Sequence, residues 1–320
     1  MNYDVVCVGS STIDVFIKIS RKFSKCRPGD KILINSINFE TGGGASNAAV
    51  SLSRLKCKVA YLGKFGNDED SKRLISEYKT EKIDLIPTSL SRLRTPYSVI
   101  LESDLENDKL SYTYKGAAND LRDDDFDMGQ IKTKWLYIAT NLGTSRKTVE
   151  KLAVYLSKKG VKILFNPSSY MARNKSDVNR ILKLTDILVL NKNEARIITN
   201  SKKQFKSLSV DLFKMGPKVI IITDGKRGVY YNDGIKELFM NAKKTKVVSV
   251  AGAGDAFTSA YLAGIIKNLD VETSLKWGLE NASSVLTNIG TKNDLLTIEE
   301  IKKLSKTKKY LKSTKFEKKR

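Results

Sequence analysis

The segment Gly252–Asp255 reads Gly-Ala-Gly-Asp and opens an apolar helical stretch over residues 256–266. Its two glycines let the backbone turn tightly and approach a ligand closely. The first N–H groups of the following helix lack partners within the helix, so its start favours a bound phosphate. Asp255 would repel that phosphate, but it suits a base that takes a proton from a hydroxyl group attacking it. The segment predicts phosphoryl transfer to an alcohol, although an isolated Gly-Ala-Gly-Asp is equally typical of a turn and helix cap.

The absence of histidine makes this carboxylate more important. The chain of 320 residues contains none, which excludes Ser-His-Asp and Cys-His catalysis and most transition-metal sites. A general base must therefore be Asp, Glu, Lys or Tyr. The three cysteines, Cys7, Cys26 and Cys57, have no Cys-x-x-Cys spacing, which argues against a disulfide framework or a structural zinc site. A reducing cytoplasm is the expected location.

Composition favours a globular protein that does not enter membranes. The apolar content is 41%, and the longest apolar runs, such as Val219–Ile222, are far too short to span a bilayer. The start of the chain has no secretory pattern. The net charge is +22, and residues 302–320 hold ten Lys or Arg against one acid, Glu317. We expect residues 306–320 to form a solvated basic tail; the alternative is a nucleic-acid arm, which no aromatic ladder supports.

Strands and helices alternate from about residue 130 onward. Short, mostly continuous apolar runs are typical of parallel strands that are covered on both faces. The expected strands are 4–9, 58–63, 135–139, 161–165, 186–190 and 218–223, with helices such as 146–159 and 203–214 between them. This alternation predicts an α/β fold with a doubly wound, mostly parallel sheet between helices.

Polar residues follow five of these strands. They are Gly9-Ser10, Thr140-Asn141, Asn166-Pro167, Asn191 and Thr223-Asp224. Open α/β sheets bind ligands outside the carboxyl ends of their strands, so we expect these residues to converge on one cleft.

Three segments with alternating polarity interrupt this rhythm: 31–39, 97–101 and 110–115. They are typical of half-buried antiparallel strands with one solvent face. We expect a small inserted β-sheet lid, built from segments about 15–40 and 95–117, that closes over substrate and excludes water. Residues 1–305 then form one domain around that lid.

A second glycine-rich segment, Thr41–Ala49, leads into a helix over residues 50–55. With the Gly252–Asp255 segment it resembles the two signature motifs of the ribokinase-like (PfkB) family of carbohydrate and nucleoside kinases. The resemblance covers roughly residues 3–301. The matching segments keep the family's order, and the remaining ones are 9–14, Gly63 with Gly66, 191–194 and 223–228.

The resemblance implies a role for each matched residue. Asp14, Gly42, Gly43 and Asn47 would hold hydroxyls of the sugar or ribose. Asn191 and Glu194 match a motif that positions Mg²⁺ through water, since magnesium commonly keeps several waters. Nucleotide contacts would come from Asn191, Thr223, Gly225, Gly228 and Asn281, the last beside adenine. Asp255 would be the base, with the amides of Gly252, Ala253 and Gly254 stabilising the transferred group.

The family resemblance implies an ATP- and Mg²⁺-dependent kinase that phosphorylates a sugar hydroxyl. A nucleoside kinase is the alternative within the family, in which Tyr112 and Tyr114 would stack on a base. An inactive nucleotide-, sugar- or RNA-binding protein is the alternative from another class. Ser249-Val250 stands where the family often has Asp-Thr, which leaves dependence on a monovalent cation open. The family's lids often pair, so a homodimer through the lid is expected.

Overall fold

The computed structural model describes residues 2–106, 109–306 and 314–315. The strands are β1 (Tyr3–Val8), β2 (Thr12–Ile19), β3 (Ser36–Gly42), β4 (Val59–Leu62), β5 (Asp84–Leu85), β6 (Tyr97–Ser103), β7 (Lys109–Tyr114), β8 (Thr133–Ile138), β9 (Lys162–Phe165), β10 (Ile187–Asn191), β11 (Val219–Thr223), β12 (Val229–Asn232), β13 (Glu237–Met240) and β14 (Thr314–Lys315). The α-helices are α1 (Gly44–Arg54), α2 (Glu69–Thr80), α3 (Gly143–Lys158), α4 (Ser169–Ala172), α5 (Lys175–Leu182), α6 (Lys192–Thr199), α7 (Phe205–Phe213), α8 (Ala253–Ile266), α9 (Val271–Val285) and α10 (Ile298–Ser305). Short 3-10 helices cover Phe23–Lys25, Gly116–Asn119, Asp123–Asp125, Met128–Gln130 and Gly225–Arg227.

The large sheet has the strand order β14-β13-β12-β11-β10-β9-β8-β1-β4-β5. It is parallel from β11 to β5, and β12, β13 and β14 extend one edge in antiparallel pairs. The doubly wound α/β prediction is confirmed, and each of the six strands expected for this sheet is present with its bounds shifted by at most two residues. The strand order changes direction between β1 and β8. Such a switch point opens a crevice at the carboxyl ends of the strands.

Helices cover both faces of this sheet because successive strand residues point to opposite sides. In β1, Val5 and Cys7 belong to a core shared with α1, α2, α8, α9 and α10, whereas Val6 and Val8 belong to a core shared with α3, α4, α5, α6 and α7. All four side chains are fully buried, which explains why β1 reads as a continuous apolar run.

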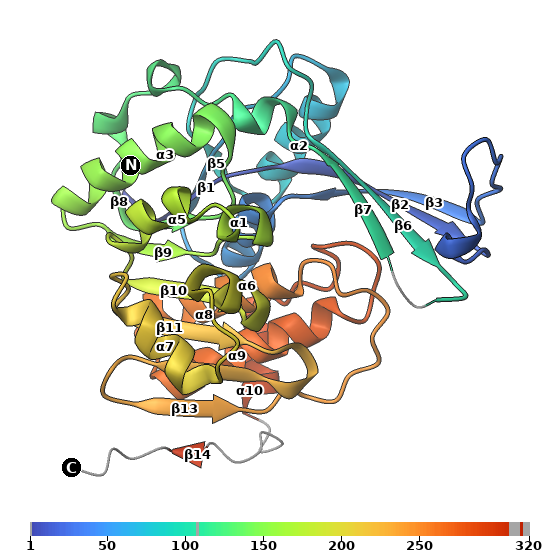
Figure 1. The fold of residues 1–320 in the computed structure, drawn as a ribbon. Helices are drawn as coiled ribbons and strands as arrows, with labels where there is room; N and C mark the ends of the chain where they lie inside the picture. The colour runs from blue at the N-terminus through green and yellow to red at the C-terminus, as the bar shows by residue number, and fades with distance from the viewer. Residues whose placement is uncertain (1, 107–108, 307–313, 316–320) are drawn as a thin grey trace.

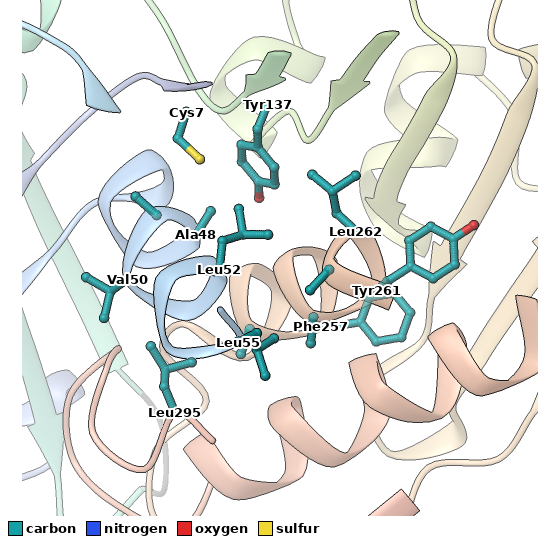
Figure 2. Close-up of a cluster of buried hydrophobic side chains, with 14 of the residues drawn as sticks. Cys7, Ala48, Val50, Leu52, Leu55, Tyr137, Phe257, Tyr261, Leu262 and Leu295 are labelled. Atoms are coloured by element: carbon teal, nitrogen blue, oxygen red, sulfur yellow. The ribbon is translucent and has the colours of Figure 1, made fainter. Parts of the chain in front are cut away.

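Helices α1 and α8 lie side by side and run in the same direction. Ser259 of α8 donates a hydrogen bond to Ser51 of α1 (Oγ–Oγ, 2.7 Å), and Lys267 reaches the carbonyl oxygen of Lys56 at their other ends (3.1 Å). Ala48 of α1 and Ala260 of α8 are fully buried in the core that the two helices share, and small side chains of this kind let helices approach closely. Figure 2 shows Leu52 from α1 and Leu262 from α8 in the same apolar cluster.

A separate four-stranded sheet, with the order β3-β2-β6-β7, projects from the main body (Figure 1). This sheet is the predicted lid. The pairs β2–β3 and β6–β7 are antiparallel, but the central pair β2–β6 is parallel, which corrects the expectation of antiparallel strands throughout. Each hairpin leaves the main domain on its first strand, β2 or β6, and these outgoing strands pair.

The alternating pattern also predicted the wrong bounds for one lid strand, β3. The strand expected over residues 31–39 begins only at Ser36, and Leu33 is 92% exposed with no strand partner. The strand β2 showed no alternating polarity, because most of its residues are buried on both faces. Alternation identifies a strand only where one face meets solvent.

The basic tail, residues 306–320, lies mostly outside the described residues. Thr314–Lys315 forms β14 and pairs with β13 at Leu238 and Phe239, so this part of the tail is not the solvated appendage we expected. An edge strand such as β13 offers unpaired N–H and C=O groups to a further strand. None of the described helices combines the length and apolarity needed to cross a bilayer.

Candidate active site

A cavity of about 310 Å³ opens at the carboxyl ends of the parallel strands. Polar residues that follow β1, β8, β9, β10 and β11 line it: Ser10, Thr140, Asn166, Asn191 and Thr223. The predicted convergence is therefore confirmed. Gly9, Asn141 and Asp224 were also expected there but do not line the cavity. Asn141 donates to the carbonyl oxygen of Ala139, and Asp224 forms ion pairs with Lys192 and Arg227.

Asp255 links the two glycine-rich segments across this cavity. It lies in the first turn of α8, and its Oδ2 accepts a hydrogen bond from Asn47 Nδ2 at 2.8 Å in the first turn of α1. Asn47 Oδ1 accepts in turn from Thr291 Oγ1 at 2.8 Å, which fixes the orientation of the amide. Asn47 was expected to hold substrate, but its contacts assign it to Asp255.

The other carboxyl oxygen of Asp255, Oδ1, has no hydrogen-bond donor among the described residues. Burial raises the pKa of Asp255 from 3.8 to about 6, the hydrogen bond from Asn47 lowers it, and the charge of Asp14 raises it. A carboxylate with a pKa near 6 is a stronger base than an exposed one and is still mostly ionised at neutral pH. Asp255 can therefore accept a proton from a ligand hydroxyl in the cavity.

Asp14 lines the cavity from β2, and Gly42 and Gly43 make room for it. Thr12 donates to Asp14 Oδ1 at 2.7 Å. A Cβ at Gly42 would lie 1.9 Å from Asp14 Oδ2, so a side chain there would displace the carboxylate. Gly43 lines the cavity with φ at 95°, and a Cβ there would lie 2.4 Å from the carbonyl oxygen of Ser10. The structure thus brings Asp14 and Gly43 together, with Gly42 behind them.

Asn191 and Glu194 cap the start of α6 reciprocally. Asn191 Oδ1 accepts from the Glu194 N–H, and Glu194 Oε2 accepts from the Asn191 N–H, each at 2.9 Å. Both residues line the cavity. Burial raises the pKa of Glu194 from 4.5 to about 7; hydrogen bonds from Asn191 and Ser169 lower it, and Asp255 raises it. Burial also raises the pKa of Asp14, so three carboxyl groups with raised pKa values line one cavity, and such a cavity fits a bound cation.

The described residues contain no group of three Asp, Glu, Cys or His side chains able to enclose a metal ion. The Oε1 atom of Glu194 accepts only one long hydrogen bond, from Ser169 Oγ at 3.3 Å, so it can also bind a ligand. This donor set fits Mg²⁺ held partly through water, since magnesium keeps several waters when bound by few carboxylates.

The start of α8 has the form expected of an anion site. Gly252 caps the helix with φ at 78°, and a Cβ there would lie 2.6 Å from the carbonyl oxygen of Thr291. The first intrahelical bond runs from the Ala256 N–H to Gly252. The amides of Ala253 and Gly254 precede it and have no intrahelical partner. Of the three predicted residues only Gly254 lines the cavity.

The predicted nucleotide-binding turn reaches the cavity only through Thr223. Gly225 and Gly228 lie outside the lining, with φ at 52° and 122°. A Cβ at Gly228 would lie 1.9 Å from the carbonyl oxygen of Met240, so this glycine permits β13 to pack closely.

Asn281, expected beside adenine, lies elsewhere. It is fully buried in α9, donates to Ser51 Oγ and the carbonyl oxygen of Ala256 at 3.0 Å each, and accepts from the Leu296 N–H at 2.9 Å. These contacts correct the expectation, because they make Asn281 a tie between α1, α8 and α9 beneath the site.

Of the lid residues that line the cavity, the sequence identified Asp14 but missed Ser98, Thr113 and Lys115. Asp14, Ser98 and Thr113 stand opposite one another on β2, β6 and β7 and all line the cavity, as does Lys115 just beyond β7. Tyr112 and Tyr114 point to the other face of the lid and are 63% and 48% exposed. Period-two alternation could have separated Thr113 from the two tyrosines.

Comparisons with known proteins identify the family of this chain. A family model described as "pfkB family carbohydrate kinase" matches residues 2–298. A 5-dehydro-2-deoxygluconokinase from Clostridium perfringens is 28% identical, over 96% of this chain and 94% of its own. Two solved structures share the fold. They are an Arabidopsis thaliana ribokinase complexed with ribose and ATP (TM-score 0.80, 21% identity, 96% and 100% coverage) and a Methanocaldococcus jannaschii nucleoside kinase (TM-score 0.78, 21% identity, 94% and 97% coverage).

The fold and the site define a phosphotransferase with an alcohol group as acceptor. The chain belongs to the pfkB family of carbohydrate kinases, within which sugar and nucleoside kinases share this architecture.

The raised pKa of Asp255 predicts a pH-dependent gain of stability in Asp255→Asn. Native Asp255 holds its proton up to about pH 6, whereas an ordinary Asp loses it near 3.8. The native state therefore binds more protons between these values, and stability falls as pH rises through that window. An asparagine stays neutral and can still accept from Asn47. We expect the variant to be more stable than the parent at pH 8 by up to about 3 kcal/mol, and nearly equal at pH 4.

Urea unfolding of ligand-free protein at pH 4, 6 and 8 measures this difference. Asp124→Asn, on the exposed 3-10 helix Asp123–Asp125, is the matched control and should show no such trend. An Asp255→Asn variant whose stability relative to the parent is the same at all three pH values would contradict the expected pKa.

Proposed function

We propose that the protein transfers the γ-phosphate of ATP to a hydroxyl group of a sugar, with Asp255 as general base. One observation carries this proposal. Asn47 holds one carboxyl oxygen of Asp255 at 2.8 Å, while the other is left for a substrate hydroxyl in the cavity. Proton removal by a positioned base typically accelerates such a reaction by about 100- to 10,000-fold.

The remaining cavity residues divide between acceptor and nucleotide. Asp14 would accept hydrogen bonds from sugar hydroxyls, as an ionised carboxylate does. The unpaired amides at the start of α8 would stabilise charge on the transferred phosphoryl group. Asn191 and Thr223 line the part of the cavity formed by β10 and β11, where ATP would bind. Glu194 would hold Mg²⁺ through water, and the ion would neutralise phosphate charge.

The cavity favours a sugar over a nucleoside. The tyrosines that would stack on a base, Tyr112 and Tyr114, are absent from its lining, which is instead rich in hydroxyl, amide and carboxylate groups. The matched relative's name, 5-dehydro-2-deoxygluconokinase, also supports a carbohydrate acceptor. An inactive binding protein would not need a buried carboxylate that Asn47 holds by one oxygen and that faces the cavity with the other. The three free cysteines fit a cytoplasmic enzyme.

An assay for ADP release with Mg·ATP and a panel of sugars and nucleosides tests this function. We expect turnover with at least one sugar, and we expect Asp255→Asn to lower kcat by about 100- to 10,000-fold with ATP binding nearly retained. Asp124→Asn should behave like the parent. Equal turnover in Asp255→Asn would remove the residue from its role, and a silent panel alongside salt-sensitive RNA binding would favour the binding protein.

We further propose that the lid pairs with the lid of a second copy. The face opposite the cavity carries Ile37, Phe39, Leu110, Tyr112 and Tyr114, each between 44% and 63% exposed. Cross-strand pairing places all of them on one side of the sheet, together with apolar residues of β2 and β6. Exposed apolar surface of this kind is typical of a protein interface.

Light scattering after size exclusion tests the pairing. We expect a mass near twice the 35.8 kDa of one chain, and a shift towards one chain in a Phe39→Glu, Tyr112→Glu double variant. Val154→Glu, at a 38% exposed position on α3, is the control and should leave the mass unchanged. A parent protein that stays monomeric at tens of micromolar would contradict the pairing.

A further inference from the structure

Lys292 is a buried lysine that lies outside the lining of the active-site cavity. It belongs to the turn between α9 and α10. Its Nζ donates hydrogen bonds to side chains of three other elements: Glu77 Oε2 of α2 at 2.5 Å, Ser46 Oγ of α1 at 2.8 Å and Thr41 Oγ1 of β3 at 3.1 Å. Lysine is almost never fully buried unless it is paired, so this position needs a reason.

The consecutive residues Thr291 and Lys292 fix both ends of the glycine-rich segment 41–47. Thr291 Oγ1 donates to Asn47 Oδ1 at 2.8 Å, and the carbonyl oxygen of Thr41 lies 3.2 Å from the same hydroxyl group. The ammonium group of Lys292 adds a hydrogen bond to a side chain near each end of the segment. One turn of the chain therefore determines where this segment starts and where it enters α1.

The two ends of segment 41–47 lie beside two carboxylates of the cavity. In the pairing of β2 with β3, Thr41 is one position from the partner of Asp14. At the other end, Asn47 holds Asp255 by one carboxyl oxygen. The position of the segment therefore sets the spacing between Asp14 and Asp255, the two groups that would act on one acceptor molecule.

The helix that carries Glu77, α2, is itself attached to the lid. Its N-cap residue Asp68 accepts hydrogen bonds from the Thr95 N–H at 2.7 Å and from Thr95 Oγ1 at 2.6 Å, just before β6. Arg73 Nη2 donates to the carbonyl oxygen of Phe39 in β3 at 2.8 Å. Glu77 thus holds the ammonium group of Lys292 from a helix that is fixed against both hairpins of the lid.

Fold stability alone does not explain a buried ion pair of this kind. Burial lowers the pKa of Lys292. Three carboxylates oppose this effect through their charges: Glu77, Asp14 and Glu81. Taking two charges out of water costs free energy that their attraction only partly returns, and an apolar pair of similar volume is often no less stable. An apolar pair could not supply the three directed N–H donors that Lys292 supplies.

We propose that Lys292, held by Glu77, is a positioning residue of the kinase, which sets the spacing between Asp14 and Asp255 by fixing the segment 41–47. This inference rests on the proposed kinase function and adds to it a residue that touches neither the substrate nor the reacting atoms. The ammonium group also acts on Asp14 electrostatically. Burial raises the pKa of Asp14, and the charge of Lys292 is one of the effects that lower it.

Steady-state kinetics of a Glu77→Gln, Lys292→Met double variant test the proposal. Because both charges are removed together, no unpaired charge stays buried, and we expect a urea midpoint close to that of the parent. We expect kcat with a sugar acceptor to fall by about 10- to 100-fold, since small displacements of reacting groups have effects of this size. The KM for ATP should stay nearly unchanged.

The pH dependence of the KM for the sugar separates positioning from stability. Of the two charges in the pair, the one that acts on Asp14 is that of Lys292, and its loss should raise the pKa of Asp14. The charges of Lys115 and Asp255, which also interact with Asp14, remain in the variant. As the pH falls, the KM should therefore begin to rise at a higher pH in the double variant than in the parent.

A second buried lysine provides the matched control. Lys64 bonds to both carboxyl oxygens of Asp125 at 2.8 Å, and the two side chains are each 5% exposed. We expect the Lys64→Met, Asp125→Asn double variant to keep the kcat and the pH dependence of the parent. Parent-like kcat and pH dependence in the Glu77→Gln, Lys292→Met variant would overturn the proposal. Failure of that variant to fold would overturn it too, because the pair would then serve stability.

Hydrogen exchange measured by mass spectrometry separates failure of this inference from failure of the kinase function, because it needs no turnover. We expect amides in residues 41–47 to exchange about 10-fold faster in the Glu77→Gln, Lys292→Met variant than in the parent, with α7 unchanged in both. Equal exchange of residues 41–47 in the two proteins would overturn the assignment of Lys292, even if a sugar is phosphorylated. Faster exchange without any phosphorylated acceptor would support the assignment and count against the kinase function.

Discussion

The parallel contact between α1 and α8 sets the position of the reacting groups. Small buried residues let the two helices approach, and the Ser51–Ser259 hydrogen bond fixes their register. One turn earlier on both helices, the same register brings Asn47 to Asp255. Two segments 208 residues apart thereby meet at one wall of the cavity. Asn281 and Thr291 support this pairing from behind.

Opposing effects set the basicity of Asp255, and burial, the hydrogen bond from Asn47 and the charge of Asp14 all contribute. Burial raises its pKa, the hydrogen bond from Asn47 lowers it, and burial is the larger effect, since the result lies near 6. The hydrogen bond orients the carboxylate while burial keeps it basic. Glu194 experiences the same conflict with a similar outcome. The cavity thus contains carboxylates whose negative charge is only partly balanced by the surrounding protein groups. Such a cavity suits the binding of cations and of groups that donate a hydroxyl hydrogen.

The sequence predicted most of the fold and the chemical centre of the site. Continuous apolar runs located the parallel strands, and Asp255, Asp14 and Glu194 all line the cavity. Sequence order could not show that Asn47 holds the base, because that depends on helix register between distant segments. Lys115 escaped notice because a single lysine among many carries no pattern until the lid strands are in register. Asn281 was wrongly placed beside adenine, because the residues next to it along the chain do not reveal that its side chain is buried.

The pH dependence of kcat/KM for the parent and for Asn47→Ala tests most directly whether this helix contact tunes the base. The account predicts an acidic limb near pH 6 in the parent. Loss of the amide donor removes an interaction that lowers the pKa of Asp255, so the limb should move to higher pH in Asn47→Ala. Asn179→Ala, on the exposed surface of α5, should leave it in place. An acidic limb at the same pH in Asn47→Ala and the parent would contradict the account.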